Sequence, residues 1–273
     1  MKPGIKLLEI SQRDHMLIDT HAHLDHFSDE EIPGILERAR VAGIEMIISS
    51  GTTLQSSTRS VKLSAKFNEF FAGVGIHPMN LIGPISESNC EQMAQLAKSS
   101  EKVLVISEIG LDFMNGSPDR AIQYQAFRQQ IKLALNLNIP IVFHSRDAHL
   151  ETLRILREES AYKVGGIMHY FQASLDIAYQ AIDLGFLISL ARPLLRLPEL
   201  QKVVENIPLK HIVLESDSAP QPFKTKRENW TEPRHVKCVA SKLAEIKKTS
   251  IEEIKSITSQ NFLMISRAQK HFK

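Results

Sequence analysis

Two histidines separated by a single residue, His21 and His23, close a short apolar run that begins at Met16. Side chains alternate between the two faces of a strand, so both imidazoles share one face if this run is a strand. Two imidazoles on one face at the end of a strand can bind the same metal ion. Because a His-x-His pair is common by chance, it indicates a metal site only if further ligands join it.

Five other ionisable residues also lie at the ends of apolar runs: His77, Glu108, His144, His169 and Asp217. Any one of them alone is more often structural, as a hydrogen-bonded histidine or as a carboxylate that caps a helix. Buried together without partners, however, such groups would cost on the order of several kcal/mol each. Metal cations remove that cost because they bind the same lone pairs. We therefore expect a metal centre.

The candidate metal ligands are His21, His23, Glu108, His144, His169 and Asp217. This set is too large for one tetrahedral ion, so we expect two divalent cations about 3.5–4 Å apart. Imidazole and carboxylate ligands suit Zn²⁺, Mn²⁺ or iron, and Mg²⁺ suits the carboxylate-rich side. Glu108 can bridge the two ions because each carboxylate oxygen can bind one. A water held between the ions would ionise near neutral pH and attack a phosphoester, an amide or a lactone.

Strand-like and helix-like segments alternate along the chain and would position these residues. We predict strands over Met16–His21, Ile44–Ser49, Phe70–Ile76, Val103–Glu108, Ile139–His144, Gly166–Tyr170, Phe186–Leu190 and Ile212–Ser216. Amphipathic stretches with helical periodicity lie between them, and Ala121–Leu137 is the clearest. Eight strands with helical crossovers in about 250 residues predict an α/β fold, a closed (β/α)8 TIM-like barrel. The alternative, an open doubly wound sheet, lacks its glycine-rich phosphate-binding motif here.

The composition is that of a globular protein. The chain has 273 residues, of which 43% are hydrophobic, and its net charge of +2 does not by itself indicate a nucleic-acid or membrane partner. No apolar run is long enough for a signal peptide or a membrane span, so we expect a cytoplasmic protein. Cys90 and Cys238 have no Cys-x-x-Cys partner, which argues against a disulfide framework or a zinc ribbon.

The sequence predicts one domain. We expect an N-terminal extension over residues 1–15 and a single hydrolase barrel over residues 16–273, because no linker, low-complexity tract or charge block separates a second unit. Gly83–Asn89 is rich in small polar residues and is expected to be a loop.

Six motifs in order resemble the TatD-type metal-dependent deoxyribonucleases, within the wider amidohydrolase-like barrels. They are Ile18–Asp25, Gly73–Pro78, Glu108–Phe113, Phe143–Ala148, Ile167–Phe171 and Leu214–Asp217. The resemblance implies two ligand sets, His21, His23, Glu108 and Asp217 for one cation and Glu108, His144 and His169 for the other. It also implies that the substrate is DNA, whose phosphodiesters are often hydrolysed in this family from the 3′ to the 5′ end with Mg²⁺ or another divalent cation.

The chain departs from the family pattern at two places on the predicted mouth. Gln172-Ala173 replaces the usual Ser-Gly after the sixth strand, and the segment after Asp217 is stretched to cover Ser218–Pro233. This segment contains several basic residues and Trp230, whose indole could stack on a base. A solvated loop with a partly buried tryptophan is the alternative. Both departures leave the ligands in place but affect the choice of substrate.

Three residues are predicted to take part in catalysis. Asp217 would orient the attacking water or take its proton, and Glu108 would hold the two cations together. His77 would orient a phosphate or the water, or would hydrogen-bond a ligand carboxylate from behind. Asp19 and Asp25 are expected to support the imidazoles of the first histidine pair.

Three basic residues are predicted to bind substrate. Arg146 could bind a phosphate oxygen bidentately, and the alternative is that it pairs with Asp147 within its own loop. Lys226 and Arg227, with Lys224 and Arg234, could line a groove for a nucleic-acid backbone.

Two other functions stay open at this point. One is a hydrolase of the same build that acts on a small amide, lactone or phosphotriester. Many such barrels bridge their metals with a carboxylated lysine of the fourth strand, where this chain has Glu108, which favours the nuclease-like group. The other is a metal-binding adaptor without catalysis, against which the nearly full ligand set argues. Nothing in the sequence indicates an obligate protein partner.

Overall fold

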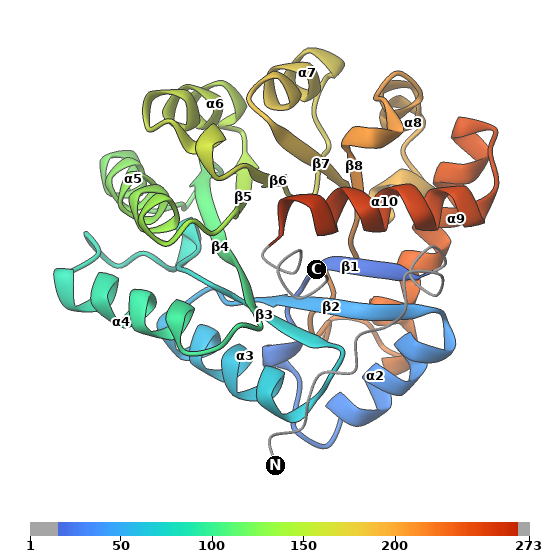
Figure 1. Cartoon of the computed structure of the whole chain (residues 1–273), viewed down its shortest axis with the longest axis horizontal. Coiled ribbons are helices and arrows are strands. Elements are labelled where there is room, and N and C mark those ends of the chain that lie inside the picture. The colour runs from blue at the N-terminus through green and yellow to red at the C-terminus, as the bar shows by residue number, and fades with distance from the viewer. Residues whose placement is uncertain (1–15, 267–273) are drawn as a thin grey trace.

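The computed structural model of this protein describes residues 16–266. Within this range eight parallel strands form one sheet whose order follows the sequence. The strands are β1 (Leu17–Ala22), β2 (Ile44–Ser50), β3 (Phe70–Val74), β4 (Val103–Asp112), β5 (Ile141–Arg146), β6 (Gly166–Met168), β7 (Phe186–Leu190) and β8 (Ile212–Leu214). The sheet curls into a nearly closed barrel, so the predicted (β/α)8 architecture is confirmed (Figure 1).

Helices connect the strands and surround the barrel (Figure 1). They are α2 (Ile32–Val41), α3 (Leu54–Lys66), α4 (Glu87–Lys98), α5 (Arg120–Leu137), α6 (His149–Glu158), α7 (Leu175–Asp183), α8 (Pro198–Glu205), α9 (Val236–Lys247) and α10 (Ile251–Ile265). Since all strands are parallel, their C-terminal ends meet at one end of the barrel, which we call the mouth. None of these helices combines the length and the apolar character needed to cross a bilayer.

The barrel closes between its first and last strands through residues at the mouth. The backbone N–H of Asp217 donates to the carbonyl of His21 (2.9 Å), and that of His23 donates to the carbonyl of Ser218 (2.8 Å). The Thr20 hydroxyl donates to the carbonyl of Leu214 (3.0 Å). The seam therefore holds the start and the end of the chain's predicted ligand set side by side.

Apolar side chains fill the barrel below the mouth. Those that point inward form one cluster: Met16, Ile18, Met46, Ile48, Leu104, Val105, Val142, Ile167, Leu187, Val213 and Phe262. Other strand side chains, such as Ile47 and Phe143, pack outward against the helices. Because both faces of each strand are buried, the strands are almost continuously apolar until their last residues. Polar groups are thereby confined to the mouth.

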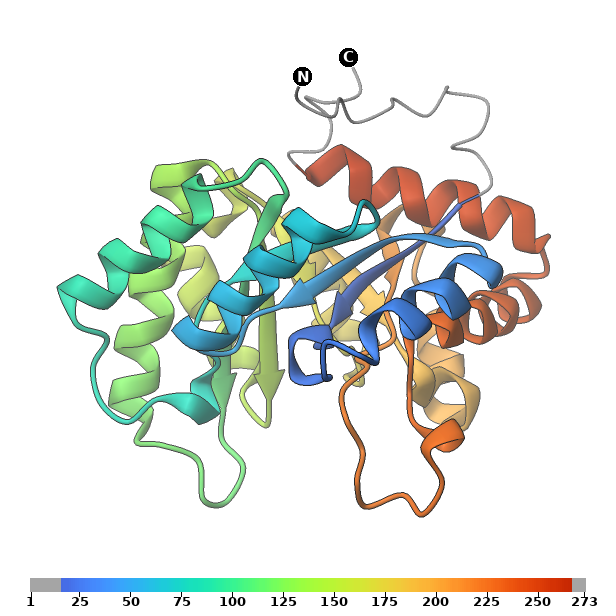
Figure 2. The same cartoon turned by 90° about the horizontal axis from the view of Figure 1, so that it is seen from below.

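Helix α10 covers the opposite end of the barrel (Figure 2). Its Phe262 belongs to the inner apolar cluster. The Ser259 hydroxyl donates to the carbonyl of Met16, and the Asn261 side-chain amide donates to the carbonyl of Ile212, each at 2.8 Å. The helix seals the end of the barrel away from the mouth.

The element boundaries differ from the prediction at several strands and one helix. β4 was expected to end at Glu108 but continues to Asp112, because its pairing with β5 resumes after a register shift between Ile106 and Ile109. β6 and β8 each end two residues earlier than expected. The expected loop Gly83–Asn89 is wrong in its last three residues, since the Ser86 side chain caps α4. The expected extension, residues 1–15, lies outside the described residues.

Candidate metal centre

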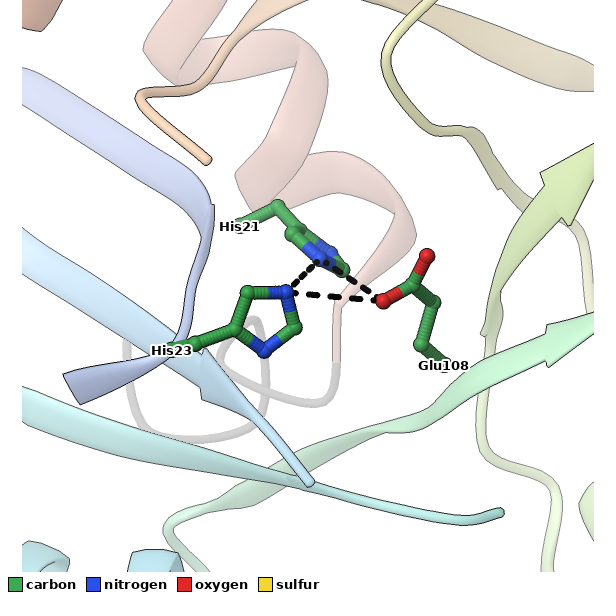
Figure 3. A group of neighbouring side chains, drawn as sticks. All are labelled: His21, His23 and Glu108. Atoms are coloured by element: carbon green, nitrogen blue, oxygen red, sulfur yellow. Dashed lines mark hydrogen bonds and ion pairs between the residues drawn. The ribbon is translucent and has the colours of Figure 1, made fainter. Parts of the chain in front are cut away.

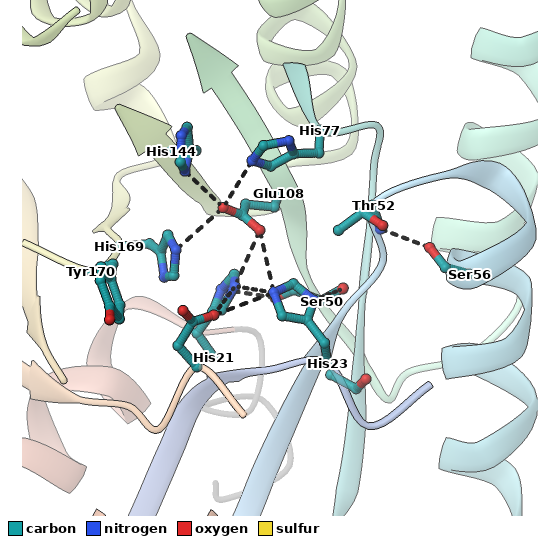
Figure 4. A network of polar contacts seen from close by, with 12 residues as sticks. His21, His23, Ser50, Thr52, Ser56, His77, Glu108, His144, His169 and Tyr170 are labelled. Atoms are coloured by element: carbon teal, nitrogen blue, oxygen red, sulfur yellow. Dashed lines mark hydrogen bonds and ion pairs between the residues drawn. The ribbon is translucent and has the colours of Figure 1, made fainter. Parts of the chain in front are cut away.

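Seven predicted site residues converge at the mouth from six of the strands or the segments that follow them. They are His21 and His23 (β1), His77 (after β3), Glu108 (β4), His144 (β5), His169 (after β6) and Asp217 (after β8). Figure 4 shows the side chains of the five histidines and Glu108 turned toward a common centre. The structure thus brings together every residue proposed as a ligand, while their role in binding metal stays a prediction.

One oxygen of the Glu108 carboxylate faces the histidine pair of β1 (Figure 3). Its Oε2 lies 3.3 Å from His21 Nε2 and 3.5 Å from His23 Nε2. Asp217 approaches the same two rings, with Oδ1 3.4 Å from His23 Nε2 and 4.0 Å from His21 Nε2. Two imidazoles and two carboxylates therefore surround one small volume.

The other oxygen of Glu108 faces a second group of imidazoles (Figure 4). Its Oε1 lies 3.1 Å from His144 Nδ1, 3.2 Å from His169 Nε2 and 3.4 Å from His77 Nε2. The Glu108 side chain is only 4% exposed. Each oxygen of this buried carboxylate thus lies within 3.5 Å of a different group of ring nitrogens.

The outer nitrogen of each candidate ligand imidazole has an oxygen beside it. His23 Nδ1 lies 3.0 Å from the Ser50 carbonyl, which can only accept, so this nitrogen carries the proton. His144 Nε2 lies 2.9 Å from Asp112 Oδ2, and His169 Nδ1 lies 2.9 Å from Glu215 Oε1. In a neutral ring the inner nitrogen then keeps its lone pair, as a metal ligand requires. The donor set therefore fits divalent cations.

His77 has the opposite arrangement. The backbone N–H of Met79 donates to its Nδ1 (3.1 Å), so in the neutral ring the proton lies on Nε2, which faces Glu108. Burial lowers the pKa of His77, although Glu108 opposes that effect, and the neutral ring is thereby favoured. By distance alone His77 could join a cation group with Glu108 and His144. Its tautomer instead makes it a hydrogen-bond donor into the site.

Two carboxylates behind the imidazoles were missed by the sequence reasoning. Asp112 Oδ2 accepts from His144 and from Arg146 Nε (2.8 Å), and its Oδ1 accepts from the Met114 N–H and the Ser117 hydroxyl. Burial alone would raise the pKa of Asp112, but these donors lower it well below the usual range. Asp112 could have been recognised from its position in the Glu108–Phe113 motif, where it is the last residue of β4.

Glu215 lies behind the His169 ring as Asp112 lies behind the His144 ring. Glu215 Oε1 lies 2.9 Å from His169 Nδ1, and the carboxylate accepts hydrogen bonds from the Tyr170 N–H (2.8 Å) and the Ser189 hydroxyl (2.6 Å). It is fully buried and precedes Asp217 by two residues, so it lies in the Leu214–Asp217 motif. Groups of this kind fix the orientation of a ligand ring and increase its basicity.

The supporting role expected for Asp19 and Asp25 stays a prediction, and the structure shows their hydrogen-bond partners. Asp19 accepts from the backbone and hydroxyl of Ser216, and Asp25 accepts from the Ser49 hydroxyl. Ser50 lies behind both imidazoles of the β1 pair, since its hydroxyl is 3.0 Å from His21 Nδ1 and its carbonyl contacts His23. Asp19 also accepts from the backbone N–H of His21 (3.4 Å), so it joins β1 to the segment after β8 at the barrel seam.

Comparison with known proteins places this geometry in a family. The sequence matches the family model described as TatD related DNase over residues 18–267. This chain belongs to the TatD-related DNase family. The resemblance predicted from the motifs is confirmed.

Relatives cover almost the whole length of this TatD-related chain. The uncharacterized metal-dependent hydrolase YabD of Bacillus subtilis is 36% identical over 252 residues, which cover 90% of this chain and 97% of YabD. The human deoxyribonuclease TATDN3 is 29% identical over 268 residues, 93% of this chain and 96% of TATDN3. The crystal structure of YjjV, a TatD homologue from Escherichia coli, has a TM-score of 0.83 at 26% identity and covers 93% of this chain and 98% of its own. The protein is a metal-dependent hydrolase of the TatD family.

The three predicted substrate-binding residues lie at the mouth of this family member. Arg146 pairs with Asp112 of the neighbouring strand (Nη2 to Oδ2, 2.6 Å) and not with Asp147, the partner considered from the sequence. Arg227 pairs with two carboxylates, and Lys226 is exposed. Their contact with substrate stays a prediction. The Trp230 ring lies partly buried against Arg227, 4.6 Å from the guanidinium carbon.

We predict that the TatD-related centre releases protons when it binds Zn²⁺ or Mn²⁺. Burial alone would lower the pKa of His169, but Glu215 and Glu108 raise it to about 10, and Asp217 and Glu108 likewise raise the pKa of His23 to about 9. Both rings are therefore protonated at pH 7 without a cation, and only the neutral rings can bind one. Binding should tighten as the pH rises toward these values.

Calorimetric titration of the metal-free protein at pH 7, in buffers of different ionisation enthalpy, measures this release. We expect about two protons per chain. Release of no protons would show that the rings are already neutral before metal binds.

Proposed function

We propose that this protein hydrolyses DNA phosphodiester bonds as a 3′-to-5′ exonuclease with two divalent cations. The observation that carries the proposal is the position of the Glu108 carboxylate between two groups of imidazoles. One of its oxygens faces His21 and His23, and the other faces His144 and His169. A shared carboxylate of this kind is the arrangement that holds paired cations for in-line displacement at phosphorus. Membership of the TatD-related DNase family and the name of the human relative support the choice of DNA.

The cations would be Mg²⁺, Mn²⁺ or Zn²⁺. The residues for one would be His21, His23, Glu108 and Asp217, and those for the other would be Glu108, His144 and His169. When bound, two such cations would neutralise the charge on the reacting phosphate and lower the pKa of an attacking water.

The chain's own residues would orient the substrate and move the proton. His77 Nε2–H points into the site and would donate to a phosphate oxygen. The Asp217 side chain is 29% exposed, more open to the mouth than that of Glu108, so it can reach a water there. Although burial raises its pKa, His23 and His169 lower it below the usual value, so the carboxylate is ionised and able to accept a proton.

The first prediction from this proposal concerns Glu108. In the Glu108→Ala variant neither set of imidazoles has a carboxylate to share, so bound metal and turnover should both fall, turnover by about 10³-fold or more. Metal content is measured by mass spectrometry. Turnover is measured on 3′-labelled and 5′-labelled single-stranded DNA, with metal-stripped protein resupplied with each cation.

The matched control is Glu91→Ala, on the exposed surface of α4, which should keep both properties. A Glu108→Ala protein with wild-type turnover would contradict the bridging role. Hydrolysis of an amide or lactone panel, with DNA left intact, would overturn the choice of substrate. Release of nucleotides from the 5′ end would overturn the direction.

The second prediction separates the donor role of His77 from a ligand role. Because its Nε2 carries the proton, His77→Ala should keep the wild-type metal content while kcat falls about 10²-fold. His169→Ala, in contrast, removes a ring whose inner nitrogen can bind a cation once its proton is released, and should lower the metal content. If His77→Ala loses metal to the same extent as His169→Ala, His77 is a ligand and the tautomer argument is wrong.

A further inference from the structure

Three cationic side chains at the mouth have no acidic partner among the residues that the structure describes. Arg192 and Arg196 follow β7, at the start and just beyond the end of the short helix η4 (Arg192–Leu195), and Lys224 lies in the segment after β8. Within residues 16–266 none of the three forms an ion pair, although many other cations of the protein do. Cations gathered near one another without an anion raise the local positive potential and favour an anionic ligand.

The neighbouring arginines of the same loop are neutralised within the protein. Arg38, Arg227 and Arg234 all pair with the buried carboxylate of Glu232, at 2.8, 3.0 and 3.2 Å, and Arg227 also pairs with Glu31. This network ties the segment after β8 to α2, and Figure 2 shows that segment, in orange, projecting from the barrel. The paired arginines therefore anchor the segment after β8 to α2, and the unpaired cations remain available to bind an anionic ligand.

Two of the three cations, Arg192 and Lys224, border a hollow of about 560 Å³, and Arg196 follows the short helix η4 that begins at Arg192. The residues that line the hollow are Arg192, Phe223, Lys224, Thr225, Glu228, Asn229 and His235. Arg192 is held by the Thr231 hydroxyl (2.9 Å), and Lys224 is held by the side-chain oxygen of Gln221 (2.7 Å) and the carbonyl of Asn229 (2.9 Å). These contacts fix the positions of the cations without cancelling their charge.

The charge of the hollow stays positive when its other groups are counted. Glu228 is the one carboxylate among the lining residues. Burial, with Arg192 and Arg234, lowers the pKa of His235, so its ring adds no charge near neutral pH. Arg192 and Arg196 also lower the pKa of Lys224, after burial, which places the three cations within electrostatic reach of one another.

Tyr170 lies beside the metal centre just after β6, the strand that pairs with β7, and Arg192 and Arg196 follow β7. Tyr170 directly follows His169, and the two rings lie 5.6 Å apart (Figure 4). Its backbone adopts φ +50° and donates to Glu215, which fixes where the ring can point.

We propose that Arg192, Arg196 and Lys224 form a second phosphate-binding subsite, which holds the phosphates of a single nucleic-acid strand next to the one at the metal centre. A single strand supplies one negative charge per nucleotide, which several separated cations can match. Phe223, at the rim of the hollow, is 78% exposed and can stack on a base. The inference rests on the proposed function, because that function places the reacting phosphate at the metal centre.

The test measures equilibrium binding of a fluorescent oligothymidylate whose terminal linkage is a hydrolysis-resistant phosphorothioate. One phosphate at a time, along the linkages that follow, is replaced by an uncharged methylphosphonate. Each strand is titrated into the metal-loaded wild type and into Arg192→Gln/Arg196→Gln. If the subsite exists, one or two replacements weaken binding to the wild type about tenfold and hardly affect the variant, because the charge pair has already been removed.

Two further variants keep the test independent of folding. Arg196→Gln alone removes no hydrogen bond of the described chain and should lower the salt dependence, the slope of log Kd against log salt, by about 0.7. Arg157→Gln, an exposed arginine of α6 on the outside of the barrel, should leave the slope and the Kd unchanged.

The outcomes separate the subsite from the proposed function. If every methylphosphonate replacement weakens binding by the same factor in the wild type and in Arg192→Gln/Arg196→Gln, the phosphates and the arginines act independently. That result overturns the subsite, whether or not the protein hydrolyses DNA. A coupled loss in a protein that hydrolyses no DNA supports the subsite, and it is then the exonuclease proposal that fails.

Discussion

A single buried carboxylate, Glu108, is the group on which the architecture of this protein depends. It sits among five imidazoles with its side chain 4% exposed, and imidazoles to either side of it lie within 3.5 Å. Burial opposes ionisation of Glu108, but the surrounding imidazoles and the hydrogen bond from His144 lower its pKa well below the usual value. A carboxylate without such partners would not stay ionised at this depth. The inner ring nitrogens in turn face this carboxylate, where each can hold a proton or bind a cation.

The barrel provides what that arrangement requires. Residues at the ends of different parallel strands can converge only if the sheet closes, and the closing bonds between His21 and Asp217 come from the candidate ligands' own backbones. The extension of β4 past Glu108 places Asp112 beside His144, so the strand supplies both a group at the centre and a group behind it. The apolar interior below keeps water away from the other side of the site.

Much of this could be predicted from local patterns, and some could not. Strands and candidate ligands were found because each ligand follows an apolar run, which is visible within a few residues. Asp112 and Glu215 were missed because their role depends on which imidazole lies against them across strands. Likewise, Arg227 and Lys224 look equivalent in the sequence, and only the fold shows that the first is paired with Glu232 while the second is not.

The most direct test of the account is the electron paramagnetic resonance spectrum of the protein titrated with Mn²⁺. If the two oxygens of Glu108 each bind a cation, two Mn²⁺ ions per chain lie about 3.5–4 Å apart and are coupled through the carboxylate. The account predicts a stoichiometry of two and the spectrum of an exchange-coupled pair, which should be lost in Glu108→Ala. A stoichiometry of one, or two ions with the spectra of isolated Mn²⁺, would contradict it.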